Sequence, residues 1–161
     1  MNRVQLLRDQ LKWAHDTQEA TMSDVTKEAA DFNKTGEAIP VGAAYAHSIW
    51  GEDMVVSTIL AGKEPLLKDG TEVGLSIPVP TMDNWSEHAN WYKTVKVDLS
   101  KMREFAKKVY QATDDYLASL SEEDLDKELD LSSMGMGKQT VVYVFTNFVL
   151  LHIANLTGQL S

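Results

Sequence analysis

The chain has 161 residues, with 15 lysines and arginines, 24 aspartates and glutamates and no cysteine. This length suits a single domain over residues 1–161 that is long enough to bury a hydrophobic core. The absence of cysteine excludes disulfides, thiolate metal sites and a thiol nucleophile carried by the protein itself. The formal net charge of −9 argues against a face that binds nucleic-acid phosphates, because such faces are rich in lysine and arginine.

The acidic charge is concentrated in one segment. Eight acidic residues and one lysine lie between Asp114 and Asp130, so this segment carries −7 and the rest of the chain only −2. A cluster of this kind is usually a solvated face and loop, and a docking surface for a basic partner is the less favoured alternative.

The chain shows no targeting signal. Its first residues alternate apolar and charged side chains and lack the apolar core of a signal peptide. The most apolar stretch, residues 141–151, is too short to span a bilayer. We therefore expect a soluble, cytoplasmic protein.

Apolar residues at spacings of three and four predict a first helix from Val4 to Phe32. The middle of its apolar stripe is polar, because Gln18 and Thr21 stand where apolar residues are expected. A satisfied polar patch is the favoured interpretation, and the lining of a cavity is the alternative.

A second helix begins near Pro40, a residue suited to a first helical turn, and ends near Gly62. Glu52 and Asp53 are the only formal charges between residues 40 and 60, which predicts a helix buried on most of its circumference.

Residues 62–83 hold three of the four prolines and three glycines, so they predict a long connection rather than a helix. Long loops are often functional, but a crossover between distant helices explains this one equally well. Asp83 could then cap a short helix that carries His88 and two tryptophans.

Two further long helices complete the pattern. Asp98 could cap the third, whose apolar residues keep a heptad-like spacing from Leu99 to Leu120. In the last segment, 140–160, β-branched residues favour a strand, whereas its length and the earlier helices favour a buried helix, which we choose. The predicted fold is an all-α four-helix bundle with a long crossover loop between helices 2 and 3.

His47 and His152 are the residues best placed to carry chemistry. Both lie in predicted buried helices, and a buried imidazole needs a partner, which is a metal, a polar side chain or a carbonyl. For each alone a structural role is favoured, but together on facing helices they form the start of a metal site. A helix with two ligands usually repeats histidine at the fourth position, and here that position is Leu156.

Three segments carry the most distinctive pattern of the chain: AYAHSIWGED, WYKTVKVDLSKMREFAKKVYQATDDYLASLSEEDLD and LLHIANLTGQLS. Together they resemble the DinB/YfiT-like superfamily of bacterial four-helix bundles, and the resemblance covers most of the chain. It implies an up-down-down-up bundle, frequent homodimers and a divalent metal, commonly zinc or nickel. Some members of that superfamily are thiol-dependent transferases and isomerases, and many have no known activity.

The resemblance also implies a ligand set. One histidine of the second helix, matched by His47, and two of the last helix, matched by His152 and position 156, would hold the metal. Gly158 and Gln159 match the pair that closes the motif. Because position 156 is leucine, the triad is incomplete unless Glu52, Asn155, Gln159 or a residue of a partner completes it. Two histidines would bind metal more weakly than the three protein ligands of a catalytic zinc site.

Two functions remain open from the sequence. The slightly favoured one is a weak metal binder or a non-catalytic protein that binds a small ligand. The alternative is a metal-dependent thiol transferase or hydrolase, in which a borrowed thiol or water is activated and Gln18, Thr21 and Trp50 line the substrate pocket. The net charge disfavours a third hypothesis, a DNA-associated protein.

Overall fold

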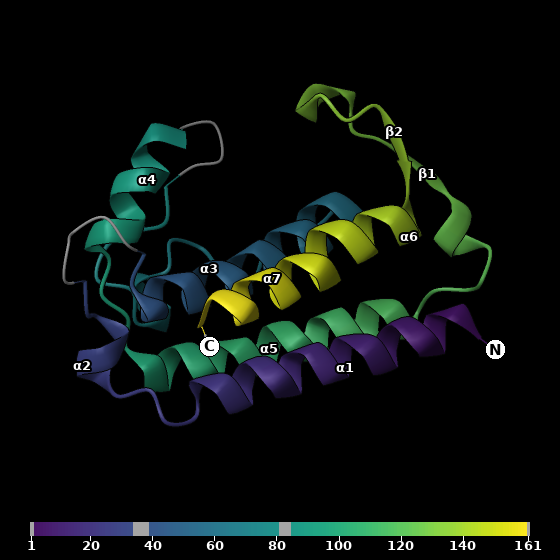
Figure 1. Ribbon diagram of the computed structural model, residues 1–161. Helices are drawn as coiled ribbons and strands as arrows, with labels where there is room; N and C mark the ends of the chain where they lie inside the picture. Colours follow the sequence, from purple (N-terminus) through teal and green to yellow (C-terminus); the bar gives the residue numbers. More distant parts are fainter. Residues whose placement is uncertain (1, 34–38, 81–84, 161) are drawn as a thin grey trace.

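The structure is a computed structural model that describes residues 2–33, 39–80 and 85–160. Four long helical segments make up most of it (Figure 1). They are α1 (Arg3–Met22), α3 (Val41–Asp53) with its π-helical continuation η1 (Met54–Leu60), α5 (Leu99–Ala118), and the run α6 (Val141–Val144), η5 (Phe145–Leu150, π-helical) and α7 (Leu151–Leu160). The shorter elements are α2 (Lys27–Ala30), η2 (Thr71–Val73), α4 (Trp85–Thr94), η3 (Asp124–Asp126), β1 (Glu128–Asp130), η4 (Ser132–Met134) and β2 (Lys138–Thr140).

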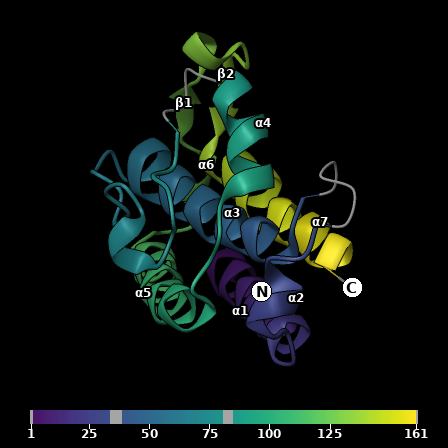
Figure 2. The same ribbon diagram turned by 90° about the vertical axis from the view of Figure 1, so that its left-hand side faces the viewer.

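The long helices pack around a shared interior. Helices α1 and α3 each pack against both α5 and α7, so every long helix has two neighbours. Helix α4 and the β1–β2 hairpin stand at opposite ends of the side formed by α3 and α7 (Figure 1). Figure 2, turned by 90°, shows both of them on that same side. The chain is therefore mainly helical, as the sequence predicts.

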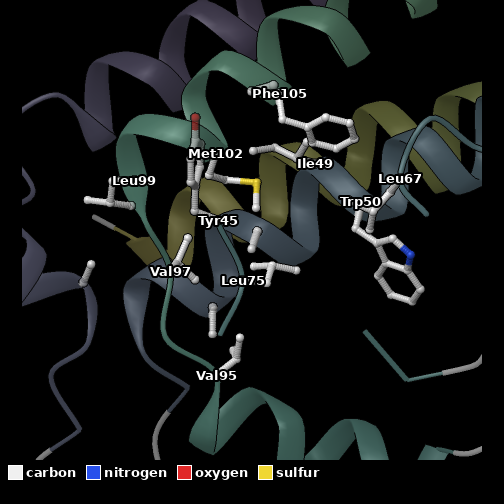
Figure 3. Packing of buried hydrophobic residues seen from close by; sticks show 14 of the residues in the cluster. Tyr45, Ile49, Trp50, Leu67, Leu75, Val95, Val97, Leu99, Met102 and Phe105 are labelled. Atoms are coloured by element: carbon white, nitrogen blue, oxygen red, sulfur yellow. The ribbon is translucent and has the colours of Figure 1, made fainter. Parts of the chain in front are cut away.

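The core consists of two apolar clusters along the length of the helices. One lies between α3, the start of α5 and the loops around α4, and Figure 3 shows its large members, including Tyr45, Ile49 and Phe105. The other joins α1 to the last helix and the end of α5, with Leu11, Phe145 and Ile153 among its buried residues. The sparse charge of the second predicted helix thus correctly indicates that α3 is surrounded by packing on most sides.

Side-chain capping explains where two of the long helical segments, α5 and the last one, begin. The carboxylate of Asp98 accepts hydrogen bonds from the backbone N–H groups of Ser100 and Lys101 and so starts α5, as expected. The hydroxyl of Thr140 accepts from the N–H of Tyr143 and starts the last helix.

The first helix is shorter than the apolar spacing predicts. Helix α1 ends at Met22, and the hydroxyl of Thr26 caps the separate short helix α2. Phe32, placed by its spacing on the buried stripe, is 66% exposed. The prediction of one helix from Val4 to Phe32 is therefore wrong, because capping groups between residues 23 and 26 compete with continued helical hydrogen bonds.

The all-α prediction also misses a small sheet. Strands β1 and β2 form an antiparallel pair in which Glu128 faces Thr140 and Asp130 faces Lys138. The connection between them contains Gly135 and Gly137, whose φ values of 75° and 63° favour glycine. Strands of three residues are too short to show an alternating pattern, so the sequence gives no signal for them.

Asp53 fixes the start of the long connection. Its buried carboxylate accepts hydrogen bonds from the hydroxyl of Ser57 and from the backbone N–H groups of Leu66 and Leu67. The connection then leads to α4, the short helix expected there. Residues 81–83, including the expected cap Asp83, lie outside the described residues.

The last long helix, Val141–Leu160, has 20 residues and is long and apolar enough to cross a membrane by length and composition alone, with a mean hydropathy of 1.5. The apolar segment is therefore longer than the stretch 141–151 that the sequence analysis considers. In this structure the helix packs against α1 and α3, and a core helix of a globular protein meets the same two criteria.

Candidate functional site

His47 and His152 converge in the structure, a point that the sequence leaves open. Their ring centroids lie 5.0 Å apart with the ring planes at 81°. Helix α3 carries His47 and α7 carries His152, and the two helices pack against each other. Gly51, one turn after His47, lies directly beside the second ring, since a Cβ atom built there would be in van der Waals contact with Nε2 of His152 at 3.4 Å.

Tyr92 also belongs to this candidate site, although the sequence pattern does not single it out. Its hydroxyl lies 2.9 Å from Nδ1 of His47, at hydrogen-bond distance. Burial raises the pKa of Tyr92 to about 12, so the phenol keeps its proton at neutral pH. The contact joins α4 to α3 across 45 residues of chain, and no local spacing predicts a contact of that kind.

Two further rings enclose the pair. Trp50, a predicted pocket residue, lies 5.6 Å from His47 between ring centroids. The ring of His88, buried on α4, stacks on Trp50 at 5.4 Å and 27°. The short helix expected after the long connection therefore supplies both His88 and Tyr92 to this site.

A cavity of about 460 Å³ on the side of the molecule formed by α3 and α7 is bordered by His47, Trp50, Tyr92 and His152. Its polar groups come from His47, Tyr92, His152 and Asn147, and most of the rest of the lining is apolar. The residues that line it are His47, Trp50, Gly51, Met54, Val55, Ile59, Tyr92, Leu131, Met134, Met136, Asn147, Phe148 and His152. The cavity thus lies between α4 and the hairpin segment, with both π-helical segments in its walls.

Burial keeps both imidazoles uncharged at neutral pH. Burial, together with the smaller effects of the neighbouring His152 and His88, lowers the pKa of His47 from its ordinary value of 6.5 to about 4. Burial also lowers the pKa of His152. A neutral imidazole can donate one hydrogen bond and accept another, and it is the form that binds metals.

The lowered pKa of His47 makes stability depend on pH. Between pH 4 and 6.5 the unfolded chain binds a proton at this residue that the folded chain does not, so folding is favoured as pH rises. This contribution is present above pH 6.5 and is lost as pH falls toward 4, and it amounts to about 3 kcal/mol. We expect urea unfolding to show a smaller loss of stability between about pH 7 and pH 4 in His47→Gln than in the unchanged protein. Equal losses would contradict this assignment.

The donor set does not fit the three-ligand metal site that the resemblance implies. Leu156 lies one turn after His152 and is an apolar, buried side chain. Within residues 2–33, 39–80 and 85–160, no three histidine, aspartate or glutamate side chains are grouped closely enough to hold a metal ion. Two imidazoles therefore remain, one fewer than the protein ligands of a catalytic zinc site.

The expected accessory ligands point elsewhere. The carboxylate of Glu52 lies 2.8 Å from Nε2 of His15 on α1, in a buried pair. Asn155 and Gln159 are both exposed on α7. None of these three side chains therefore adds a metal-ligating atom to the pair of His47 and His152 in the structure.

Gln18 and Thr21, the other expected pocket residues, do not line this cavity. Gln18 is fully buried, and its side-chain oxygen accepts a hydrogen bond from the hydroxyl of Ser48 at 3.2 Å. The hydroxyl of Thr21 donates to the backbone oxygen of Thr17. These contacts favour a polar patch over a cavity lining for this part of α1, but the patch is only partly satisfied, because Nε2 of Gln18 has no hydrogen-bond partner among the described residues.

The polar patch extends into a network between α1, α3 and α5. The rings of His15 and Tyr110 stack with centroids 3.7 Å apart. The hydroxyls of Tyr45 and Tyr110 both donate to Oε1 of Glu19 at 2.8 Å. Burial and the charge of Glu19 raise the pKa of both tyrosines, so both hydroxyls remain donors.

Comparison with known proteins supports the fold alone. No family model matches the chain, and no curated protein matches it significantly. A conserved protein from Enterococcus faecalis, known from a crystal structure, is similar in fold with a TM-score of 0.82. The two chains are 20% identical, and the alignment covers 99% of this chain and 94% of that chain. Membership of the DinB/YfiT-like superfamily stays a prediction.

Proposed function

We propose that this protein binds a small molecule in the cavity beside His47, Tyr92 and His152. One observation carries the proposal: three polar side chains from three different helices meet at one largely apolar cavity of about 460 Å³. Cavities that bind small ligands usually measure about 300–1,000 Å³ and combine apolar walls with a few convergent polar groups.

The π-helical segments support the same location. Met54, Val55 and Ile59 come from η1, and Asn147 and Phe148 come from η5. π-Helical turns are rare and frequently lie at functional sites, because the wider turn shifts side chains away from ordinary helical positions. Both such segments of the described chain border this one cavity.

The finer fold is part of the proposal. We infer a four-helix bundle of the DinB/YfiT-like kind with up-down-down-up topology. The packing of each long helix on two others and the long connection before α5 support it. The homodimer and the cytoplasmic location stay predictions.

A neutral fluorescent dye tests the binding function. We expect N-phenyl-1-naphthylamine, which fluoresces strongly in apolar surroundings, to bind with increased emission. Ile59→Trp should abolish this binding because the larger side chain fills the cavity wall. The matched control is Leu151→Trp, the same kind of change at a position that is 53% exposed and outside the cavity lining.

Titration of the dye against each folded variant measures the effect. Equal binding by Ile59→Trp and Leu151→Trp would place the dye elsewhere and contradict the proposal. Circular dichroism spectra that match the unchanged protein establish that both variants are folded.

A divalent metal-dependent transferase or hydrolase is the second candidate. It is favoured by the convergence of two neutral imidazoles, at a centroid distance of 5.0 Å, on the wall of a cavity. Leu156 argues against it, because the third ligand position of the resemblance holds a side chain that binds no metal. We therefore derive no reaction step through a metal.

A further inference from the structure

The cavity has no formally charged wall. None of its 13 described lining residues is lysine, arginine, aspartate or glutamate. The two acidic residues of α3 point to other partners: Glu52 pairs with His15, and Asp53 accepts backbone N–H groups of the long connection. A charged ligand would therefore lose its hydration without gaining an opposite charge.

The apolar walls suit a flat ring. Met54, Met134 and Met136 bring three thioethers to the cavity from η1 and from the hairpin segment. Methionine adapts its shape to a ligand and makes favourable sulfur contacts with aromatic rings. Trp50 and Phe148 add two aromatic side chains to the same lining, which can pair with a ring in offset or edge-to-face geometry.

The pair of His47 and Tyr92 presents one donor and one acceptor whichever way its proton lies. If the Tyr92 hydroxyl donates to Nδ1 of His47, the hydrogen on Nε2 remains as a donor and the phenol oxygen as an acceptor. If Nδ1 donates to the phenol, the phenol hydrogen remains as a donor and Nε2 as an acceptor. A ligand group that both donates and accepts, such as a hydroxyl or a primary amide, matches either arrangement.

We propose that the ligand is an uncharged, mainly apolar molecule with a flat ring and one hydroxyl or amide group, which binds with that group at His47 and Tyr92. The inference rests on the proposed binding function and adds the chemical class of the ligand. Its ring lies among the methionines and aromatic side chains, and its polar group replaces the water that would otherwise hydrate the pair.

Naphthalene and three of its derivatives, all of similar size, test charge and hydrogen bonding separately. They are naphthalene, 2-naphthol, 2-naphthoate and 2-(aminomethyl)naphthalene, the last two being an anion and a cation at neutral pH. Isothermal titration calorimetry measures the affinity of each for the full chain. We expect 2-naphthol to bind most tightly, and at least about tenfold more tightly than either charged compound, because neither ion finds a counter-charge.

Tyr92→Phe tests the polar end of the site. A neutral hydrogen bond is worth about 0.5–1.5 kcal/mol, so the variant should bind 2-naphthol about 2–10-fold more weakly. Naphthalene, which makes no such bond, should bind the unchanged protein and the variant equally. Weaker binding of both compounds by the same factor would show that Tyr92 only shapes the cavity and would overturn its assigned role.

The remaining outcomes separate the two proposals. Tighter binding of 2-naphthoate or 2-(aminomethyl)naphthalene than of 2-naphthol overturns the inference about ligand charge and leaves the binding function standing. Binding of none of the four compounds by the folded protein overturns the binding function and the inference with it.

Discussion

His15→Phe is expected to lower the free energy of unfolding by about 3 kcal/mol, the upper end of the usual cost of leaving a buried polar group without its hydrogen-bond partner. The side chains of His15 and Glu52 are 9% and 1% exposed, and Nε2 of His15 lies 2.8 Å from Oε2 of Glu52. Phenylalanine keeps a ring against Tyr110 but offers the carboxylate no hydrogen bond. The cost arises because the carboxylate stays buried after its partner is gone.

The surroundings of Glu52 increase this cost. Its other oxygen, Oε1, is buried and has no hydrogen-bond partner among the described residues, and the same holds for Nε2 of Gln18 and Oγ1 of Thr113. A carboxylate that depends on a single protein partner has no second contact to take over when that partner is removed. Each polar atom left buried and unpaired costs about 1–3 kcal/mol.

A double variant distinguishes the pair from the packing around it. His15→Phe with Glu52→Met replaces both polar groups by apolar ones of similar size, so its stability should return to within about 1–2 kcal/mol of the unchanged protein. Lys12→Met serves as a control on α1. It removes the Lys12–Asp16 pair, whose side chains are 75% and 65% exposed, and should cost less than about 1 kcal/mol.

Urea unfolding followed by circular dichroism measures all three variants at one pH. A double variant no more stable than His15→Phe alone would mean that ring packing, rather than the hydrogen-bonded pair, carries the stability. In that case the polar network between α1, α3 and α5 would be incidental to the fold.

Helix positions could be predicted from the sequence where packing and capping follow local patterns. The lack of charge between residues 40 and 60 predicts the burial of α3, and Asp98 predicts the start of α5. The helix in the last segment overrides its β-branched composition, because tertiary packing outweighs weak intrinsic propensities. The spacing of apolar residues alone predicts neither the end of the first helix at Met22 nor the short β1–β2 hairpin.

The candidate site was only half predictable, for a related reason. The sequence offers His47 and His152 as the start of a metal site, but only the structure shows that their rings converge, with centroids 5.0 Å apart. Tyr92 contacts His47 because α4 packs back onto α3 after the long connection. The spacing of residues within one helix cannot predict such a contact between distant segments. Glu52 is only a possible accessory ligand from the sequence, because five residues after His47 is not an ideal helical spacing, and in the structure it pairs with His15.

The acidic segment 114–130 behaves as its favoured interpretation expects. Arg3 forms ion pairs with Glu122 and Asp126, and Arg8 pairs with Asp114. The basic residues at the start of α1 therefore offset part of the local charge of −7 within the chain itself. None of these side chains lines the cavity, so the net charge of the protein says little about the ligand.

Leu156→His is expected to turn the weak donor pair into a metal site. The new imidazole would stand four residues after His152, the spacing that directs two side chains of one helix toward one point. With His47 it completes the three protein ligands of a typical catalytic zinc site. Removing a side chain that only hydrogen-bonds to a metal ligand typically lowers metal affinity by roughly 10–100-fold. Because Leu156→His adds a ligand itself, we expect zinc affinity to rise by more than this factor.

Competition with a chromophoric chelator, on protein without a histidine tag, measures this gain. Leu156→Gln is the matched control, because it makes the same buried position polar without supplying an imidazole and should leave zinc affinity near that of the unchanged protein. If Leu156→His folds and gains no affinity, position 156 is not directed at the two histidines, and the ligand set carried over from the resemblance is wrong. If the unchanged protein already holds zinc or nickel tightly at one ion per chain, a donor outside the His47–His152 pair completes the site, and the metal-dependent function becomes the stronger candidate.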